Sequence, residues 1–150
     1  MTGTILAPLD LMDGATTDKV LTAAVAQAHA SGLPLTVMTV VPNIVTGIDY
    51  RYAIRGEMGG SADYDMAKIV ADTLERLNQV VEEKTPDGMT VKTIVRHGTV
   101  YEQVLLVAEE IGAEQIVIGA HRPGLADFLL GPNTARVVRH AKCSVNVIRV

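Results

Sequence analysis

Five short β-rich runs, separated by longer stretches of helical periodicity, constrain the fold of this chain more than any other feature. The runs are aliphatic at consecutive positions, as expected for strands that are buried on both faces of a parallel sheet. Each run is followed by a helical pattern, which indicates βαβ crossovers. The pattern therefore predicts an α/β domain, an open five-stranded parallel sheet with helices on both faces. The predicted strands are Thr4–Pro8, Leu35–Val41, Thr90–Val95, Gln115–Gly119 and Ser144–Arg149.

Four helices are predicted between these strands, from their apolar stripes and from the residues that start and stop them. Pro is favoured at the first helical position, and Gly and Pro-rich turns end helices. The predicted start and stop signals, in chain order, are Asp18 with Ser31-Gly32, Ser61 or Asp63 with Pro86-Asp87-Gly88, Thr99 with Gly112, and Pro132 with a stop near His140.

Composition sets the broad class of the protein. The 150 residues suit one domain, and 48% of them are apolar with one Phe and no Trp, so the core must be aliphatic. A single cysteine, Cys143, excludes an intramolecular disulfide. No apolar stretch is long enough to span a bilayer, and the net charge of -4 argues against binding DNA or RNA. We therefore expect one cytoplasmic domain, residues 1–150, that binds neither nucleic acid nor membrane.

Two local features each leave two readings open. The stretch from Pro42 to Gly60 is long, irregular and rich in glycine, so it is either a functional lid or disordered. The stretch from His121 to Lys142 contains four Lys or Arg residues against one Asp. Such a basic stretch either attracts a small phosphorylated ligand or is simply a solvated helix face.

Candidate ligand-binding residues follow the strands, because parallel sheets bind ligands at the carboxyl ends of their strands. Pro8, Leu9 and Asp10 follow the first strand. Gly119 opens a glycine-punctuated loop that leads to a helix start near Thr134, and such a start offers unpaired N–H groups to an anion. Neither G-x-x-x-x-G-K-[ST] nor G-x-G-x-x-G follows a strand, so a P-loop hydrolase and a dinucleotide-binding domain are both disfavoured.

Three segments, in order along the chain, carry a more specific pattern. Ile5–Asp10 reads I-L-A-P-L-D, Arg96–Gly119 contains G-T-V-Y-E-Q-V-L and A-E-Q-I-V-I-G, and Leu129–Arg149 joins L-L-G-P-N-T to C-S-V-N-V-I-R. Together they resemble the universal stress protein family over nearly the whole chain, the Pro42–Gly60 stretch excepted. The Gly119-Ala-His-Arg-Pro123 loop looks most like the small bacterial members that bind ATP.

The resemblance implies a Rossmann-like sheet of order 3-2-1-4-5, a nucleotide between strands 1 and 4, and a dimer. The implied ligand is ATP, with AMP or another adenine nucleotide as alternatives and Mg²⁺ as a companion of the phosphates. Asp10 would receive the adenine edge, although a turn or cap residue is the simpler reading of an Asp after a strand. The other implied contacts are Pro8, Leu9 and Val41 around the base, and Gly119, His121, Arg122, Gly131, Asn133 and Thr134 around the ribose and phosphates.

The chain departs from the family's ATP motif, G-x2-G-x9-G-[S/T], in three ways. Arg122 stands at the second Gly, the spacing from Gly119 to Gly131 is one residue short, and Pro132 replaces the Ser or Thr. The first two departures also occur in the small bacterial branch. Pro132 removes a hydroxyl and a backbone N–H, and a lost charge-assisted hydrogen bond costs about 1.5–3 kcal/mol. Arg122 could offset part of this loss as a bidentate phosphate donor.

Three functions are compatible with the sequence. The first is a nucleotide-binding regulatory or sensor protein acting as a dimer, with slow ATP hydrolysis or autophosphorylation as its most extensive chemistry, since no base and nucleophile pair stands out. The second is a ligand-free dimeric scaffold, which Pro132 favours. The third is a nucleotidyl-transferring enzyme, which is the least favoured because the chain has no pyrophosphate-binding loop after the first strand. The C-terminal segment Ser144–Val150, which contains the final predicted strand, is an apolar sheet edge, and we expect a two-fold dimer through it.

Overall fold

Strands and helices alternate along the computed structural model, which describes residues 3–42, 65–120 and 131–149. The sheet is parallel throughout these residues, and its strand order is β3-β2-β1-β4-β5. This order confirms the open, Rossmann-like α/β fold. The elements are β1 (Thr4–Pro8), α1 (Gly14–Ser31), β2 (Leu35–Pro42), α3 (Asp65–Lys84), β3 (Val91–Gly98), α4 (Val100–Ile111), β4 (Ala113–Gly119), α5 (Pro132–His140) and β5 (Ser144–Ile148).

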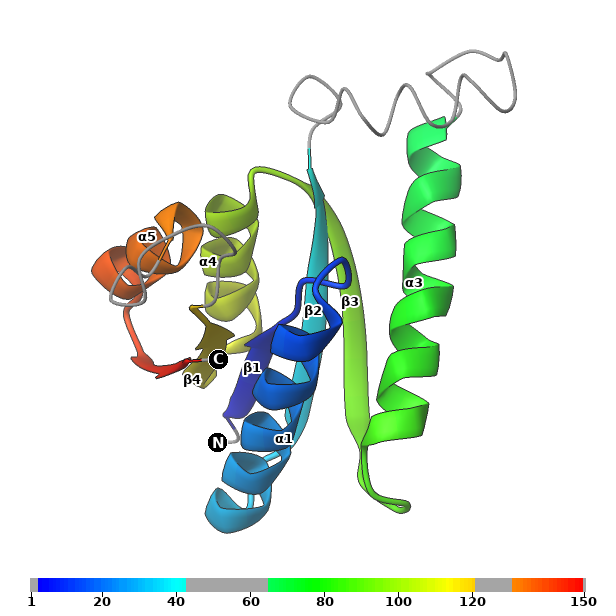
Figure 1. The fold of residues 1–150 in the computed structure, drawn as a ribbon. Helices are drawn as coiled ribbons and strands as arrows, with labels where there is room; N and C mark the ends of the chain where they lie inside the picture. The colour runs from blue at the N-terminus through cyan, green and yellow to red at the C-terminus, as the bar shows by residue number, and fades with distance from the viewer. Residues whose placement is uncertain (1–2, 43–64, 121–130, 150) are drawn as a thin grey trace.

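The sheet separates two hydrophobic cores. Helices α1 and α3 cover one face, and α4 and α5 cover the other (Figure 1). The central strand β1 supplies both cores because successive side chains of a strand point to opposite faces. Ile5 and Ala7 pack with α1, whereas Leu6 packs with α4 and α5. Helices on both faces explain why the strands are aliphatic at consecutive positions.

The first helix begins earlier than the sequence predicts. Its N-cap is Asp13, whose backbone is extended at φ -122° and ψ 90°, and not Asp18, which already lies inside the helix. Asp18 instead pairs with Lys84 of α3 at 3.0 Å. The prediction was wrong because the first turn contains small and polar residues, so its helical pattern is hidden until Val20.

Strand β3 extends further towards its carboxyl end than the predicted Thr90–Val95 segment. Arg96, His97 and Gly98 pair with the last three residues of β2. The added length follows from pairing with a long neighbour, which local β-propensity does not reveal. Strand β4 likewise begins at Ala113, two residues before the predicted start.

The predicted stop signals of α1 and α4, and the whole of α5, agree with the structure. The start of the second predicted helix at Ser61 or Asp63, and the stretch beyond Pro42, fall in residues 43–64 and lie outside the described residues. Within the described part, no helix combines the length and apolarity needed to cross a bilayer.

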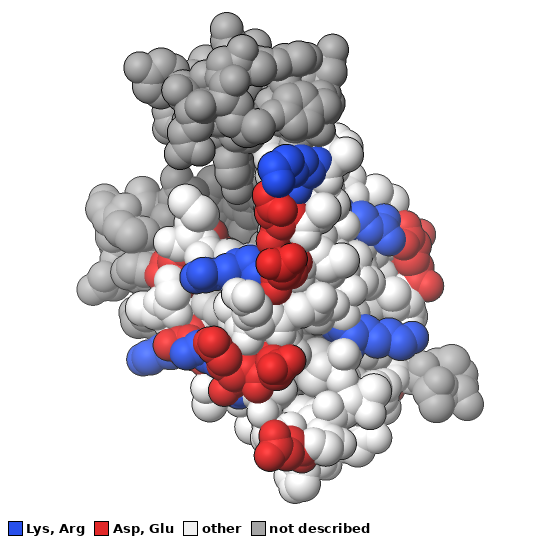
Figure 2. Space-filling view, turned by 90° about the vertical axis from the view of Figure 1, so that its right-hand side faces the viewer, with Lys and Arg blue, Asp and Glu red and all other residues white. Residues whose placement is uncertain are grey.

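The face on which α3 lies is charged but mixed in sign. Figure 2 shows Lys and Arg side chains interspersed with Asp and Glu over this side of the molecule. One such pair is Lys68 with Asp72, one helical turn apart on α3 at 3.5 Å. The described residues of this face therefore form no broad basic field of the kind that attracts a polyanion.

Candidate functional site

The carboxyl end of β1 continues beyond Pro8 as an extended segment. The backbone N–H of Leu9 donates to the carbonyl of Met38 at 2.8 Å, and the carbonyl of Leu9 accepts from the Thr39 hydroxyl at 2.8 Å. Leu9 is buried in the core on the α1 side, whereas Pro8 is half-buried. These contacts fix the chain direction where β1 leaves the sheet.

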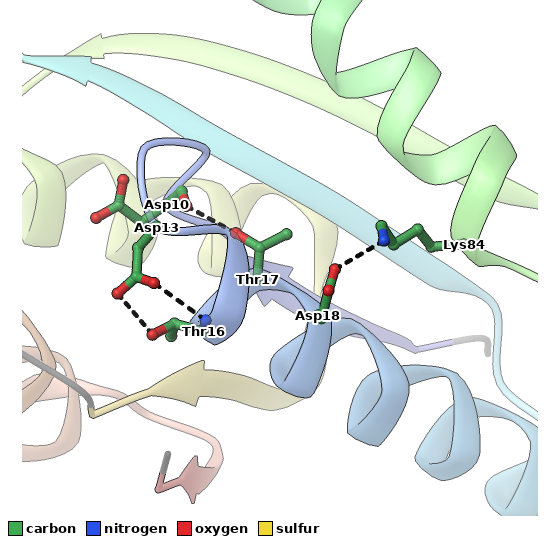
Figure 3. A network of polar contacts seen from close by, with 6 residues as sticks. All are labelled: Asp10, Asp13, Thr16, Thr17, Asp18 and Lys84. Atoms are coloured by element: carbon green, nitrogen blue, oxygen red, sulfur yellow. Dashed lines mark hydrogen bonds and ion pairs between the residues drawn. The ribbon is translucent and has the colours of Figure 1, made fainter.

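Asp10 begins a tight turn directly after this segment. Its Oδ1 accepts a hydrogen bond from the backbone N–H of Met12 at 3.0 Å. Its carbonyl accepts from the N–H of Asp13 at 3.0 Å and from the Thr17 hydroxyl at 2.7 Å (Figure 3). Asp10 is thus a turn residue, which was the simpler of the two interpretations of its sequence position. Its side chain is nevertheless exposed and can accept a further hydrogen bond from a ligand.

The N-terminus of α1 is closed by its own cap. Asp13 accepts from the Thr16 N–H at 3.2 Å through Oδ1 and from the Thr16 hydroxyl at 2.7 Å through Oδ2 (Figure 3). Both carboxylate oxygens are therefore engaged inside the chain. This arrangement makes the start of α1 a poor site for an added anion.

Gly119 ends β4 in close contact with the first turn of α1. A Cβ atom on Gly119 would lie 2.5 Å from Cγ2 of Thr16 and 3.0 Å from Cγ2 of Val20. Glycine is required at this position because no larger side chain fits between the strand and the helix. Thr16 therefore links the turn after β1 to the end of β4.

The N-terminal turn of α5 lies at the end of β4. The Thr134 hydroxyl, which is buried, donates to the Gly119 carbonyl at 2.7 Å. Gly131 is the N-cap at φ 85° and ψ 155°, a conformation that is essentially restricted to glycine, and no side chain of the described residues caps α5. The first intrahelical bond runs from Ala135 N to Gly131 O at 3.0 Å. Pro132 has no N–H, and the amides of Asn133 and Thr134 have no partner within the helix because they lie in its first turn.

Asn133 joins α5 to α4. Its Oδ1 accepts a hydrogen bond from the N–H of Tyr101 at 3.2 Å, and so caps α4 in place of Thr99, whose side chain makes no capping bond. The guanidinium of Arg136 lies 4.9 Å from the centre of the Tyr101 ring, a cation–π contact. The side-chain oxygen of Asn133 is thus committed to the protein.

Val41 is buried near the end of β2, in register with His97 of β3. His121 and Arg122 lie outside the described residues. The parallel topology brings seven of the ten residues that the sequence singled out to the carboxyl edge of the sheet or to the helix docked on it, with Asn133 beside them facing α4. These seven residues are Pro8, Leu9, Asp10, Val41, Gly119, Gly131 and Thr134.

The sequence interpretation missed Thr16, Thr17 and Tyr101, which hold the edge together. The spacing from Asp13 to Thr16 is that of an N-cap and its N3 residue, and this signal could have identified Thr16. Thr17 contacts Asp10, seven positions before it, and Tyr101 contacts Asn133, which is distant along the chain. Neither contact has a comparable local signal in the sequence.

Two groups away from this edge have perturbed pKa values. The hydrogen bond from Arg96 holds the pKa of Glu110 below its ordinary value and links β3 to α4. Burial raises the pKa of the Cys143 thiol, so this cysteine stays protonated at neutral pH and is a poor nucleophile. Among the described residues, no three His, Cys, Asp or Glu side chains are grouped to hold a metal ion.

Comparison with known proteins gives a consistent result. The model of the universal stress protein family matches residues 1–149. Universal stress protein G of Escherichia coli O157:H7 is 37% identical over 101 residues, covering 60% of this chain and 71% of that protein.

Solved structures with the same fold include universal stress protein UspA from Lactobacillus plantarum. It has a TM-score of 0.68 and 26% identity, with 98% of this chain and 97% of that chain covered. A universal stress protein from Archaeoglobus fulgidus, solved in complex with dAMP, has a TM-score of 0.63 and 19% identity, with 99% and 98% covered.

Proposed function

The chain belongs to the universal stress protein family, and we propose that it binds an adenine nucleotide, ATP in the first place, at the carboxyl ends of β1 and β4. One observation carries this proposal: the N-terminal turn of α5, which has no side-chain cap from the described residues, is held at the end of β4 by the bond from Thr134 to Gly119. Amides that have no partner within the helix and the positive end of the helix dipole favour a phosphate group at such a place. The equivalent turn of α1 is already closed by Asp13.

The adenine base would lie beside the turn after β1. The exposed carboxylate of Asp10 can accept a hydrogen bond from the exocyclic amino group of adenine, and Val41 would offer its backbone groups. Pro8, which is half-buried, would line the apolar part of the pocket, and Leu9 would border it through its backbone because its side chain is buried in the core. An amino group at this position distinguishes adenine from guanine, which presents an oxygen there, so Asp10 would contribute specificity as well as affinity.

The ribose and phosphates would lie towards α5. The backbone amides of Asn133 and Thr134 would donate to a phosphate, with Gly119 and Gly131 allowing the ligand to approach the backbone. His121 and Arg122 complete this predicted set. The complex of the Archaeoglobus fulgidus protein with dAMP supports an adenine nucleotide as the ligand class, and AMP is the alternative to ATP.

The two carboxylates at this edge of the sheet are poorly suited to coordinate Mg²⁺. Asp13 uses both oxygens to accept hydrogen bonds from Thr16, and Asp10 accepts one from Met12. Mg²⁺ requires near-ideal octahedral oxygen geometry. We therefore assign no protein ligand to Mg²⁺ and no step that depends on it.

We further propose that the protein acts as a cytoplasmic homodimer through β5 and serves as a nucleotide-responsive regulatory module. β5 lies at the edge of the sheet, next to β4. Its Val145 and Val147 face the α4 and α5 core, and its backbone edge has no neighbouring strand among the described residues. Such edges pair readily with a second copy.

The alternative is a dimeric scaffold that binds no nucleotide. Pro132 favours it, because this residue removes one of the amides that a phosphate would use. The exposure of Leu106 on α4, at 51%, also suits a protein that works through protein contacts.

One experiment separates the two functions. Purified protein would be denatured, and the supernatant would be analysed for released nucleotide by chromatography. In parallel, the thermal unfolding of protein stripped of nucleotide would be followed with ATP and, as a control, GTP. We expect released adenine nucleotide, and ATP at 100 times its Kd should stabilise the protein by about 2.7 kcal/mol. Absence of nucleotide together with no stabilisation by ATP would leave the scaffold function.

A further inference from the structure

Met12 is by far the most exposed large apolar side chain in the described part of the molecule, at 85%. It lies in the turn between β1 and α1, two residues after Asp10. The other described methionines are more protected, since Met38 is fully buried and Met66 and Met89 are half-buried. A thioether that is exposed to this degree is open to attack by an oxidant in the solvent, and the protected ones are less so.

The backbone of this turn is fixed by hydrogen bonds. The N–H of Met12 donates to Asp10 Oδ1 at 3.0 Å, and the N–H of Asp13 donates to the Asp10 carbonyl at 3.0 Å. The Thr17 hydroxyl also donates to that carbonyl, at 2.7 Å. The thioether is therefore presented from a well-defined position beside Asp10, and not from a loop without contacts.

We propose that Met12 is a peroxide-reactive modification site and that its thioether contacts the bound purine. The contact with the purine rests on the proposed function, whereas the reactivity does not. In the reaction, the Met12 sulfur attacks one oxygen of a hydroperoxide, the O–O bond breaks, and the product is methionine sulfoxide with release of water or an alcohol. The sulfur is oxidised and the peroxide is reduced, so no other reagent is needed.

Oxidation would change the binding of the nucleotide. A thioether is apolar and polarisable and packs well against an aromatic ring. A sulfoxide carries a strong dipole, which must lose water when the purine covers it. We expect oxidation of Met12 to weaken nucleotide binding by roughly three- to tenfold.

The reactivity is tested on the native full-length protein with limiting hydrogen peroxide, followed by peptide mass spectrometry over time. Met12 should be oxidised faster than Met66 and Met89, and Met38 should react only when the protein unfolds. Met89 is the matched control, because it lies before β3, at the amino ends of the strands, whereas Met12 lies at the carboxyl ends. Oxidation of Met66 or Met89 at the same rate as Met12, or faster, would overturn the assignment.

The contact is tested by repeating the reaction with saturating ATP and by measuring ATP affinity before and after oxidation. ATP should slow the oxidation of Met12 and leave that of Met89 unchanged. The Met12→Leu variant has no thioether to oxidise, so its affinity for ATP should be the same before and after peroxide treatment.

Unchanged oxidation of Met12 under saturating ATP, or equal loss of affinity in Met12→Leu, would overturn the contact. If the untreated protein binds no ATP, the contact is overturned together with the proposed function. The order of oxidation among the methionines is still decided in that case, so the two failures are distinguishable.

Discussion

Asp13 holds the first turn of α1 through two hydrogen bonds from one residue, Thr16. Loss of an N-cap side chain leaves an N–H of the first turn without a partner. We expect Asp13→Ala to lower the free energy of unfolding by about 1 kcal/mol, within a range of about 0.5–2 kcal/mol. The free energy would be measured by urea denaturation.

Asp18→Ala is the matched control for this variant, because the one side-chain contact of Asp18 among the described residues is an exposed ion pair with Lys84. Exposed pairs contribute little, so the change should stay within about 0.5 kcal/mol. A larger loss of stability in Asp18→Ala than in Asp13→Ala would show that the cap is wrongly assigned.

Gly119 is the residue at which β4 and α1 come closest. In Gly119→Ala the new methyl group would lie 2.5 Å from Thr16 Cγ2, and the strand and helix would have to separate. We expect a loss of about 1–3 kcal/mol in unfolding free energy. Any shift of β4 would also move Thr134, because the Thr134 hydroxyl is hydrogen-bonded to the Gly119 carbonyl. The affinity for the nucleotide should therefore fall as well.

Gly14→Ala provides the comparison. Gly14 begins α1, and a Cβ atom there meets nothing within 4 Å. Replacing a helical glycine with alanine at a position without strain commonly stabilises a protein by about 0.4–1 kcal/mol. Equal destabilisation by the two substitutions would contradict the role of close packing at Gly119.

At the scale of elements, α5 is the helix on which the phosphate contacts depend. Pro132 gives it a favourable first residue but removes an N–H at the end that would face the phosphate. Pro132→Ser restores the N–H and adds a hydroxyl, and we expect ATP affinity to rise by roughly ten- to a hundredfold. Calorimetric titration of ATP would measure the change.

Pro132→Ala separates the two contributions, because it restores the N–H without the hydroxyl. Its affinity for ATP should lie between those of the parent protein and Pro132→Ser. An affinity that does not change in either variant would mean that the phosphates do not contact the first turn of α5.

The elements of the fold could be predicted well from the sequence where a local signal is strong. Pro132 at the start of α5 and Gly112 at the end of α4 are local signals, and both agree with the structure. The extension of β3 to Gly98 depends on pairing with β2. The start of α1 after its N-cap Asp13 is hidden because the first turn has no large apolar residue. Local sequence patterns therefore do not reveal where β3 ends or where α1 begins.

The candidate site was predictable only as a set of positions at the carboxyl ends of strands. The role of each side chain depends on partners that are distant in sequence. Asn133 shows this plainly, since its oxygen caps α4 through Tyr101, thirty-two positions away. Gly119 was singled out because it opens a glycine-punctuated loop whose backbone a ligand could approach, and the structure adds a second reason for it, the close approach of Thr16.

At the scale of the whole molecule, the strand order leaves β5 at one edge of the sheet. We expect a homodimer in solution through this edge, with twice the 16.0 kDa mass of one chain by light scattering. Asn146→Lys places a charge on the half-buried edge strand without disturbing Val145 or Val147, which face the other side. This variant should be a folded monomer, and a dimer that survives it would place the interface elsewhere.

The strand order also places β1 and β4 side by side at the centre of the sheet, where the chain reverses its direction of progress across the sheet. Ligands bind at such a switch point in open parallel sheets. The turn at Asp10, the end of β4 at Gly119 and the start of α5 meet there through Thr16 and Thr134. A nucleotide bound at this point would contact β1, β4 and α5 at the same time.

Calorimetric titration of ATP into nucleotide-free protein, beside the Asp10→Ala variant, tests this account most directly. We predict saturable binding of one ATP per chain, with weaker binding in Asp10→Ala and none of GTP. Heat that does not saturate, or equal binding of ATP by both proteins, would contradict an adenine site beside Asp10 at the ends of β1 and β4.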